Sequence, residues 1–217
     1  MIKDNIKEVR ANLQEGVCLV AVSKYHPIEA VKEAYAEGQR IFGESREQEL
    51  RIKYECLPKD IKWNFIGHLQ TNKVKYIAPY ISLIESVDSL KLMKEINKQA
   101  EKCNRIIDIL LELHLATEET KSGMLPAECM QLLDGNEWRE MKNIRICGIM
   151  MMASATNDES KIRKEFKQAD ELFNRIKEQY FRDDVAFSIK SYGMSNDYLL
   201  AQECGSNHVR VGSKIFC

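Results

Sequence analysis

The fold can be inferred outward from one stretch, Val17-Cys-Leu-Val-Ala-Val-Ser-Lys24-Tyr-His-Pro27. Its apolar first residues predict a buried strand over residues 17–24, and Pro27 predicts the start of the next helix. Lys24 therefore stands at the carboxyl end of an inner strand, where a cation is costly to bury and its pKa is expected to fall. A lysine made neutral in this way can attack an aldehyde and form a Schiff base. The alternative is a lysine that reaches solvent from the strand end.

The rest of the chain alternates short apolar segments with amphipathic ones. Strands are predicted at residues 17–24, 39–43, 62–67, 81–87, 106–115, 144–152, 186–191 and 208–212. Helices are predicted at residues 27–37, 44–55, 89–102, 126–133 and 158–180, and Asn157-Asp158 is expected to cap the last of them. This alternation predicts an α/β fold, a single parallel (β/α)8 TIM-like barrel over residues 1–217 with no second domain. An open doubly wound sheet is the alternative architecture.

Composition excludes several classes of protein. The chain has 217 residues, 44% apolar and 30% charged, with a formal net charge of −1, the balance of a soluble globular protein. Near-neutral charge gives no electrostatic case for nucleic acid or an acidic membrane, and no stretch has the apolar length of a membrane span. The seven cysteines are scattered, with no Cys-x-x-Cys pair, which argues against zinc and disulfides and favours a cytoplasmic location.

The loop after the seventh predicted strand has features of a phosphate site. Its sequence is Ser191-Tyr-Gly-Met-Ser-Asn-Asp197, in which Gly193 permits an unusual backbone turn. Ser195 or Asn196 can cap the helix that follows, and a helix start with free amides and a hydroxyl suits a phosphate. Such a cap also occurs on many helices without a ligand.

The loop after the eighth predicted strand, Arg210-Val-Gly-Ser213, strengthens this reading because barrels bind phosphate at these two loops. Gly212 lets an amide approach an anion, and Ser213 adds a hydroxyl. Arg210 alternates with valines, so it should point into the barrel and need a partner there, either an acid such as Glu112 or a ligand. A lysine, a phosphate loop and a buried arginine describe a phosphorylated aldehyde held at three points, and pyridoxal phosphate (PLP) is such a molecule.

At these residues the chain resembles the pyridoxal-phosphate homeostasis proteins, the YggS/PROSC group, whose barrel is similar to the N-terminal domain of alanine racemase. The resemblance covers nearly the whole chain. It is carried by these motifs, in order: Ala21-Val-Ser-Lys24, Phe42-Gly-Glu-Ser45, Phe65-Ile-Gly-His-Leu-Gln-Thr-Asn-Lys73, Ile84-Glu-Ser-Val-Asp88, Lys121-Ser-Gly123, Gly148-Ile-Met150, Ser191-Tyr-Gly-Met-Ser-Asn-Asp197 and Arg210-Val-Gly-Ser213.

The resemblance implies a role for each of seven residues. Lys24 would be the Schiff-base lysine, and Arg210 would face the pyridine nitrogen of PLP. The phosphate would be held by Ser195, Gly212 and Ser213 with the amide of Met194, and Ser45 would lie near the cofactor ring. The chain departs from the family at four positions: Ser45 replaces an asparagine, Ser213 a threonine, Tyr192 a methionine and Ile149 a leucine.

These features favour a non-catalytic PLP carrier over an enzyme. Arginine offers donors only, so Arg210 would keep the pyridine unprotonated and a weak electron sink. We therefore expect a protein that holds PLP for homeostasis or delivery, with PLP-dependent apoenzymes as possible recipients, and a monomer. A PLP-dependent racemase or decarboxylase using the same lysine is the first alternative, and a cofactor-free Schiff-base aldolase on phosphorylated sugars is a weaker one.

Several motif residues carry no assigned role. His68, Gln70, Asn72 and Lys73 could line the barrel mouth or could cap and solvate the next helix. The run Met150–Met152 is expected to pack in the core, with Met150 the one candidate for ligand contact. Residues 135–140 are expected to form a loop, and Lys121 to lie in a turn near the open face.

Overall fold

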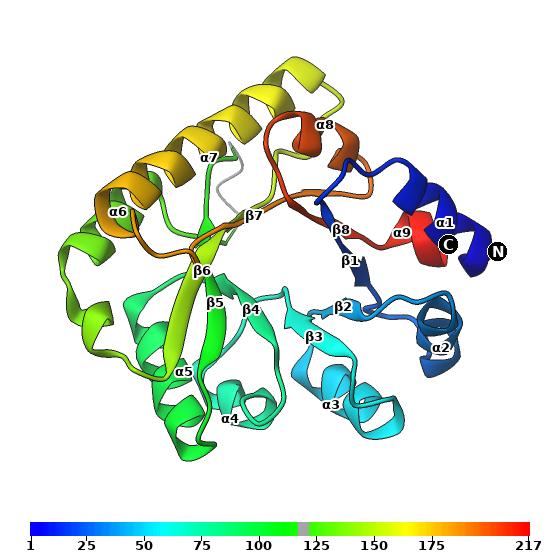
Figure 1. The fold of residues 1–217 in the computed structure, drawn as a ribbon, viewed down its shortest axis with the longest axis horizontal. Helices are drawn as coiled ribbons and strands as arrows, with labels where there is room; N and C mark the ends of the chain where they lie inside the picture. Colours follow the sequence, from blue (N-terminus) through cyan, green and yellow to red (C-terminus); the bar gives the residue numbers. More distant parts are fainter. Residues whose placement is uncertain (117–121) are drawn as a thin grey trace.

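The computed structural model describes residues 1–116 and 122–217, and in it eight parallel strands close into a barrel in chain order (Figure 1). The predicted barrel is thus confirmed, and the open sheet is excluded by the pairing of β1 with β8. The strands are β1 Cys18–Val22, β2 Ile41–Glu44, β3 Lys62–Phe65, β4 Leu83–Val87, β5 Ile107–Leu113, β6 Ile144–Met151, β7 Ile189–Met194 and β8 His208–Val211.

Helices surround the barrel. They are α1 Ile2–Ala11, α2 Ile28–Ala36, α3 Glu47–Cys56, α4 Val74–Ile77, α5 Leu90–Lys102, α6 Pro126–Asp134, α7 Glu159–Tyr180, α8 Tyr198–Glu203 and α9 Ser213–Phe216, with 3-10 turns η1 Thr71–Lys73 and η2 Glu137–Glu140. The η2 turn corrects the expectation of a plain loop over residues 135–140. Figure 1 shows α1 and α9 side by side, and Asn5 Nδ2 donates to the carbonyl oxygen of Ile215 at 3.1 Å.

The longest helix, α7, forms as its sequence predicts. Asp158 caps it, because its Oδ1 accepts hydrogen bonds from the amides of Ser160 and Lys161. Six apolar residues at helical spacing form its inner stripe, and all are buried: Ile162, Phe166, Ala169, Leu172, Phe173 and Ile176.

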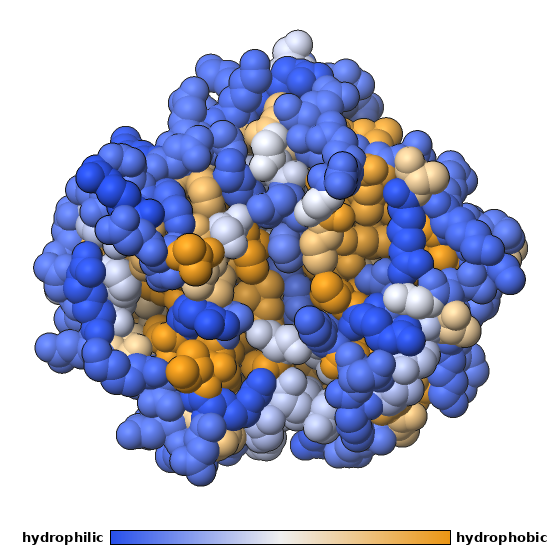
Figure 2. Space-filling model, viewed as in Figure 1, coloured by the Kyte–Doolittle hydropathy of each residue, from blue (hydrophilic) through white to orange (hydrophobic). Residues whose placement is uncertain are grey.

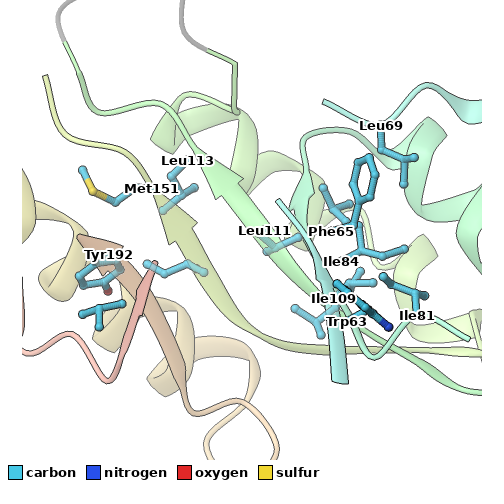
Figure 3. Close-up of a cluster of buried hydrophobic side chains, with 14 of the residues drawn as sticks. Trp63, Phe65, Leu69, Ile81, Ile84, Ile109, Leu111, Leu113, Met151 and Tyr192 are labelled. Atoms are coloured by element: carbon cyan, nitrogen blue, oxygen red, sulfur yellow. The ribbon is translucent and has the colours of Figure 1, made fainter. Parts of the chain in front are cut away.

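The core has two layers, as alternation along the strands requires. Outward side chains pack between the strands and the helices, and Figure 3 shows part of this layer around Trp63, Ile84 and Leu111. A smaller cluster of Leu83, Leu110, Cys147 and Met150 packs separately, so Met150 is a core residue. On the face in Figure 2, hydrophilic residues cover the rim and hydrophobic ones show between them nearer the centre.

One strand lies later than predicted. The apolar residues before Ile189 suggested a strand over residues 186–191, but β7 runs from Ile189 to Met194. Phe187 instead joins an aromatic stack, with its ring centroid 4.9 Å from that of Phe173 and 4.4 Å from that of Phe181. Phe187 therefore packs against α7 and lies before the start of β7.

Within the described ranges, no helix combines the length and the apolar content needed to cross a bilayer. The same residues hold no group of three or more histidine, cysteine or acidic side chains arranged to bind a metal ion.

The pairing of β6 with β7 depends on the absence of a side chain at Gly148. An added Cβ would lie 1.8 Å from the carbonyl oxygen of Ile189, and the Gly148 φ is 154°. We expect Gly148→Ala to lower the free energy of unfolding by roughly 3 kcal/mol, measured by urea denaturation. Gly135→Ala is the matched control, because its Cβ would approach nothing closer than 3.4 Å. Equal stability of the two variants would contradict this account of the strand contact.

Candidate functional site

Lys24 lies in a tight turn at the carboxyl end of β1. The amide of His26 donates to the carbonyl oxygen of Ser23 at 3.1 Å, and Tyr25 has a φ of 67°, an uncommon conformation for a bulky residue. Lys24 is partly buried, with Nζ 5.9 Å from the centroid of the Tyr25 ring. The strand was predicted to run to Lys24, but β1 ends at Val22, so the lysine lies in the turn beyond the strand, at the mouth of the barrel.

A buried network of charged side chains holds this turn in place. Lys53 is 3% exposed, and its Nζ donates to the Ser23 carbonyl oxygen at 2.7 Å, to Glu44 Oε1 at 2.7 Å and to Glu49 Oε1 at 2.6 Å. Glu44 Oε1 also accepts from the Ser23 hydroxyl, and Glu49 Oε1 accepts from the Tyr25 amide. Both neighbours of Lys24 are therefore fixed, which limits the positions its own backbone can take.

Ser45 directly follows β2, the strand that pairs with β1. The last paired residues of the two strands are Val22 and Gly43, so Lys24 and Ser45 each lie two residues beyond this pair. A Cβ on Gly67 would lie 2.6 Å from the Ser45 Cβ, so this serine packs against the backbone that follows β3. The structure thus brings Ser45 to the mouth.

The loop after β7 makes a sharp turn at Gly193, whose φ is 87° and where an added Cβ would lie 2.5 Å from that of Ala201. Neither Ser195 nor Asn196 caps α8, because its N-cap residue is Asp197. The Met194 amide, expected to hold phosphate, donates to Asp197 Oδ1 at 2.6 Å. A carboxylate therefore already accepts from this amide, which shows that the amide can serve an anion.

The loops after β7 and β8 meet at the mouth. The Gly212 amide donates to the Ser195 hydroxyl oxygen at 3.0 Å. A Cβ on Gly212 would come within 3.1 Å of the Val22 carbonyl oxygen, so the end of β8 packs tightly against β1 at this glycine. Ser213 begins α9, and within the described chain its amide and hydroxyl donate to no acceptor. These two loops therefore bring together two hydroxyls and the Ser213 amide, whose donor no described residue accepts, and such groups hold a phosphate.

Arg210 points into the barrel, whereas Val209 and Val211 pack in the outer layer. Its Nη1 donates to the Ser191 carbonyl oxygen at 2.7 Å and hydroxyl at 2.5 Å, and its Nη2 donates to the Met151 carbonyl oxygen at 2.8 Å. The acid nearest its guanidinium is Glu85, with Oε2 3.7 Å from Nη1.

The expectation that Glu112 would pair with Arg210 is therefore wrong. Glu85 is the fully buried partner, and its carboxylate also accepts from Asn64 Nδ2 at 2.7 Å and from the Ser191 hydroxyl at 2.6 Å. Glu112 instead accepts from the Ser122 hydroxyl at 2.6 Å. Burial raises the pKa of Glu112, and the nearby charge of Asp88 raises it further.

The β3–α4 and β4–α5 loops border a separate cavity of about 300 Å³ next to the mouth. His68, Gln70 and Asn72 line it, whereas Lys73 is turned away and pairs with Glu47 at 2.8 Å. His68 Nδ1 lies 3.7 Å from Asp88 Oδ2. Lys121 lies outside the described residues.

Comparison with known proteins identifies the family of the chain. The alanine racemase N-terminal domain family matches over residues 1–217. A pyridoxal phosphate homeostasis protein of Schizosaccharomyces pombe is 36% identical, with 96% of this chain and 89% of that one covered, and one of Aquifex aeolicus is 37% identical, with 91% and 85% covered. This chain belongs to the pyridoxal phosphate homeostasis family.

Solved structures of the family have the same barrel. PipY of Synechococcus elongatus PCC7942 matches with a TM-score of 0.92 in its structure without PLP and 0.90 in its structure with PLP bound, at 32% and 31% identity over all of both chains. Alanine racemase of Clostridium difficile 630 has a TM-score of 0.78 at 17% identity and covers 99% of this chain but 58% of that one. The likeness to alanine racemase shows the shared fold alone.

Sequence reasoning missed the residues that hold the site residues in place. Lys53 lies in a charged helix, where a solvated side chain is the ordinary expectation. Glu49 lies four residues before Lys53, a spacing that allows an ion pair on a helix. Neither this spacing nor the position of Glu47, six residues before Lys53, indicated that Lys53 is buried. Asn64 and Glu85 are polar residues inside apolar strands, which was an available sign that they face a polar interior.

Removing one partner from the buried network at the Lys24 turn should be costly, because the other partner keeps its charge without compensation. Lys53→Met would leave Glu44 buried without its cation, so we expect the free energy of unfolding to fall by roughly 3–5 kcal/mol in urea denaturation. Adding Glu44→Gln should restore part of the loss. Lys94→Met, which removes an exposed pair with Glu137, should cost less than about 1 kcal/mol. Similar losses at the two lysines would argue against a buried pair.

Glu112 should make stability depend on pH. Its pKa in the folded protein is raised above the ordinary value of 4.5, so the folded state keeps a proton that the unfolded state releases. Its contribution is therefore full below about pH 4.5 and is lost as the pH rises through the folded pKa. We expect Glu112→Gln to lose less stability than the native protein between about pH 4.5 and neutrality. Parallel pH profiles of the two proteins would contradict this, and Glu171→Gln on the exposed side of α7 is the control.

Proposed function

We propose that this chain is a PLP-binding protein that holds the cofactor as a Schiff base on Lys24 and does not use it for catalysis. The observation that carries the proposal is the meeting of three elements at one mouth. These are the Lys24 turn after β1, the Ser195–Gly212 contact between two anion-type loops, and the buried Arg210. The names of the relatives and the PLP-bound PipY structure support it.

The donors at the mouth fit the phosphate of PLP. Ser195 and Ser213 supply hydroxyls, and the amide of Ser213 supplies a donor that no described residue accepts. Gly212 lets the loop approach β1 closely. The Met194 amide can join this set only by leaving Asp197, so we expect phosphate binding to displace that carboxylate.

The amine of Lys24 would join the aldehyde of PLP with loss of one water. The fixed positions of Ser23 and Tyr25 orient the lysine for this without any further group. Ser45, which follows β2 at the same end of the barrel, would contact the cofactor ring with a hydroxyl. A reversible covalent bond suits the storage of a reactive aldehyde.

The surroundings of Arg210 favour holding over catalysis. An electron-sink enzyme benefits from an acid at the pyridine nitrogen, and Arg210 offers donors only. Glu85 is the acid nearest to it, but both carboxylate oxygens of Glu85 already accept from Asn64 and Ser191. The ring nitrogen would therefore stay unprotonated, which weakens stabilisation of a carbanion.

The proposal also covers the recipients of the cofactor, the oligomeric state and the location of the protein. Cofactor delivery to PLP-dependent apoenzymes, a monomeric state and a cytoplasmic location remain predictions. A racemase or decarboxylase that uses Lys24 would exchange the α-hydrogen of an amino acid with deuterated water at turnover rates. An aldolase would cleave phosphorylated sugars without any visible chromophore. Either result would replace the carrier assignment.

Reduction with borohydride after addition of PLP should attach a phosphopyridoxyl group to Lys24, which peptide mass spectrometry can locate. We expect Lys24→Ala to lose this label and the absorbance of the bound cofactor. Lys32→Ala, an exposed position on α2, should keep both. A label on another lysine, or none in the native protein, would end the claim of a Schiff base at Lys24.

A further inference from the structure

A second cavity lies at the opposite end of the barrel from Lys24. Its volume is about 430 Å³, within the range of small-molecule sites. It is bordered by α1, by the turn between α2 and β2, and by Cys18 and Ile41, which begin β1 and β2. The amino-terminal ends of the strands face this cavity, so the whole length of β1 separates it from the mouth. Its lining residues are Arg10, Leu13, Gln14, Val17, Cys18, Leu19, Gly38, Gln39, Arg40 and Ile41.

The first cation of this cavity, Arg10, is held in a fixed position. Its Nη1 donates to the carbonyl oxygen of Glu37 at 2.6 Å, and its Nη2 donates to Gln39 Oε1 at 2.8 Å. Gln39 is 4% exposed, and its Nε2 donates to the carbonyl oxygens of Leu19 and Ile41. Because the buried amide is fixed by two strands, the guanidinium that it orients is preorganised.

The second cation, Arg40, is also fixed. Its guanidinium carbon lies 3.7 Å from the centroid of the Tyr35 ring, and its Nη1 donates to the Tyr35 carbonyl oxygen at 2.8 Å. Its Nε lies 3.0 Å from Asp60 Oδ2, in a pair that is open to solvent. A guanidinium has five N–H donors, so the contacts within the described chain leave donors on both arginines for a ligand.

The rest of the lining adds apolar surface and no negative charge. Leu13, Val17, Leu19 and Ile41 supply hydrocarbon, and the two arginines are the charged residues among the described lining residues. Burial raises the pKa of the Cys18 thiol to about 11, so this side chain stays neutral as well. A cationic pair beside hydrocarbon matches a molecule with an anionic head and an apolar body.

We propose that this cavity binds a small amphiphilic anion, with a carboxylate or phosphate head at Arg10 and Arg40 and a short hydrocarbon chain against the four apolar residues. The site is separate from the mouth and does not depend on the proposed function. If the arginines served only to hold α1 and the α2–β2 turn to the barrel, the cavity would have no preference for anions.

The test is a titration of the isotope-labelled full chain, followed by amide chemical shifts. The probes are hexanoate, hexyl phosphate, acetate and hexylamine. We expect saturable shifts confined to residues 10–19 and 38–41 with the first two, and much weaker effects with acetate and hexylamine. The relative affinities of hexanoate and hexyl phosphate identify the preferred head group. No saturable shift with either anion, equal shifts with hexylamine, or shifts centred on the mouth would overturn the proposal.

Variants separate binding from structure. Arg40→Gln should weaken binding by about tenfold or more, because it removes charged hydrogen bonds. Leu13→Trp should block the cavity while both arginines remain. Arg163→Gln, which removes an exposed pair with Glu203, and Lys24→Ala should leave hexanoate binding unchanged. Unaltered affinity in both Arg40→Gln and Leu13→Trp would refute the assigned site.

Discussion

Closure of the sheet between β1 and β8 is the constraint on which the candidate site depends. The pairing of Val20 with Arg210 and of Ala21 with Val211 brings the first and last strands into one register. The same closure sets the Lys24 turn beside Gly212, although these residues are almost a chain length apart. A parallel barrel places all strand ends of one kind at one face, so side chains from distant segments meet there without any long insertion.

This arrangement requires charged side chains to be buried inside the protein. Two networks carry it: Lys53 with Glu44 under the Lys24 turn, and Arg210 with Glu85 in the interior. Burying an ion pair rarely adds net stability, but removing one partner is costly. Such networks therefore fix positions more than they strengthen the fold. In this chain, the Lys53 network fixes Ser23, the residue before Lys24. The Arg210 network fixes β7, the strand that leads to the loop containing Ser195.

The sequence predicted the barrel well because the apolar runs and the α7 stripe report directly on burial. It also predicted that Lys24 and Gly212 lie at one face, since they follow β1 and β8, which are neighbours in the closed sheet. It did not predict which acid meets Arg210. Glu85 and Glu112 lie in similar apolar strands, and the choice depends on how the strands are staggered around the barrel, which no local pattern records. Burial of Lys53 was equally hidden, because a lysine on an amphipathic helix is ordinarily solvated.

The contact of Asn5 with α9 shows how the segments of the barrel could be reconnected. Its side-chain amide donates to carbonyl oxygens of both Ile215 and Cys217, so α1 and α9 lie together on one side of the barrel. Joining them by a short linker would leave every strand with the same neighbours. The molecule is thus suited to circular permutation, with new ends opened in an exposed connection far from the mouth.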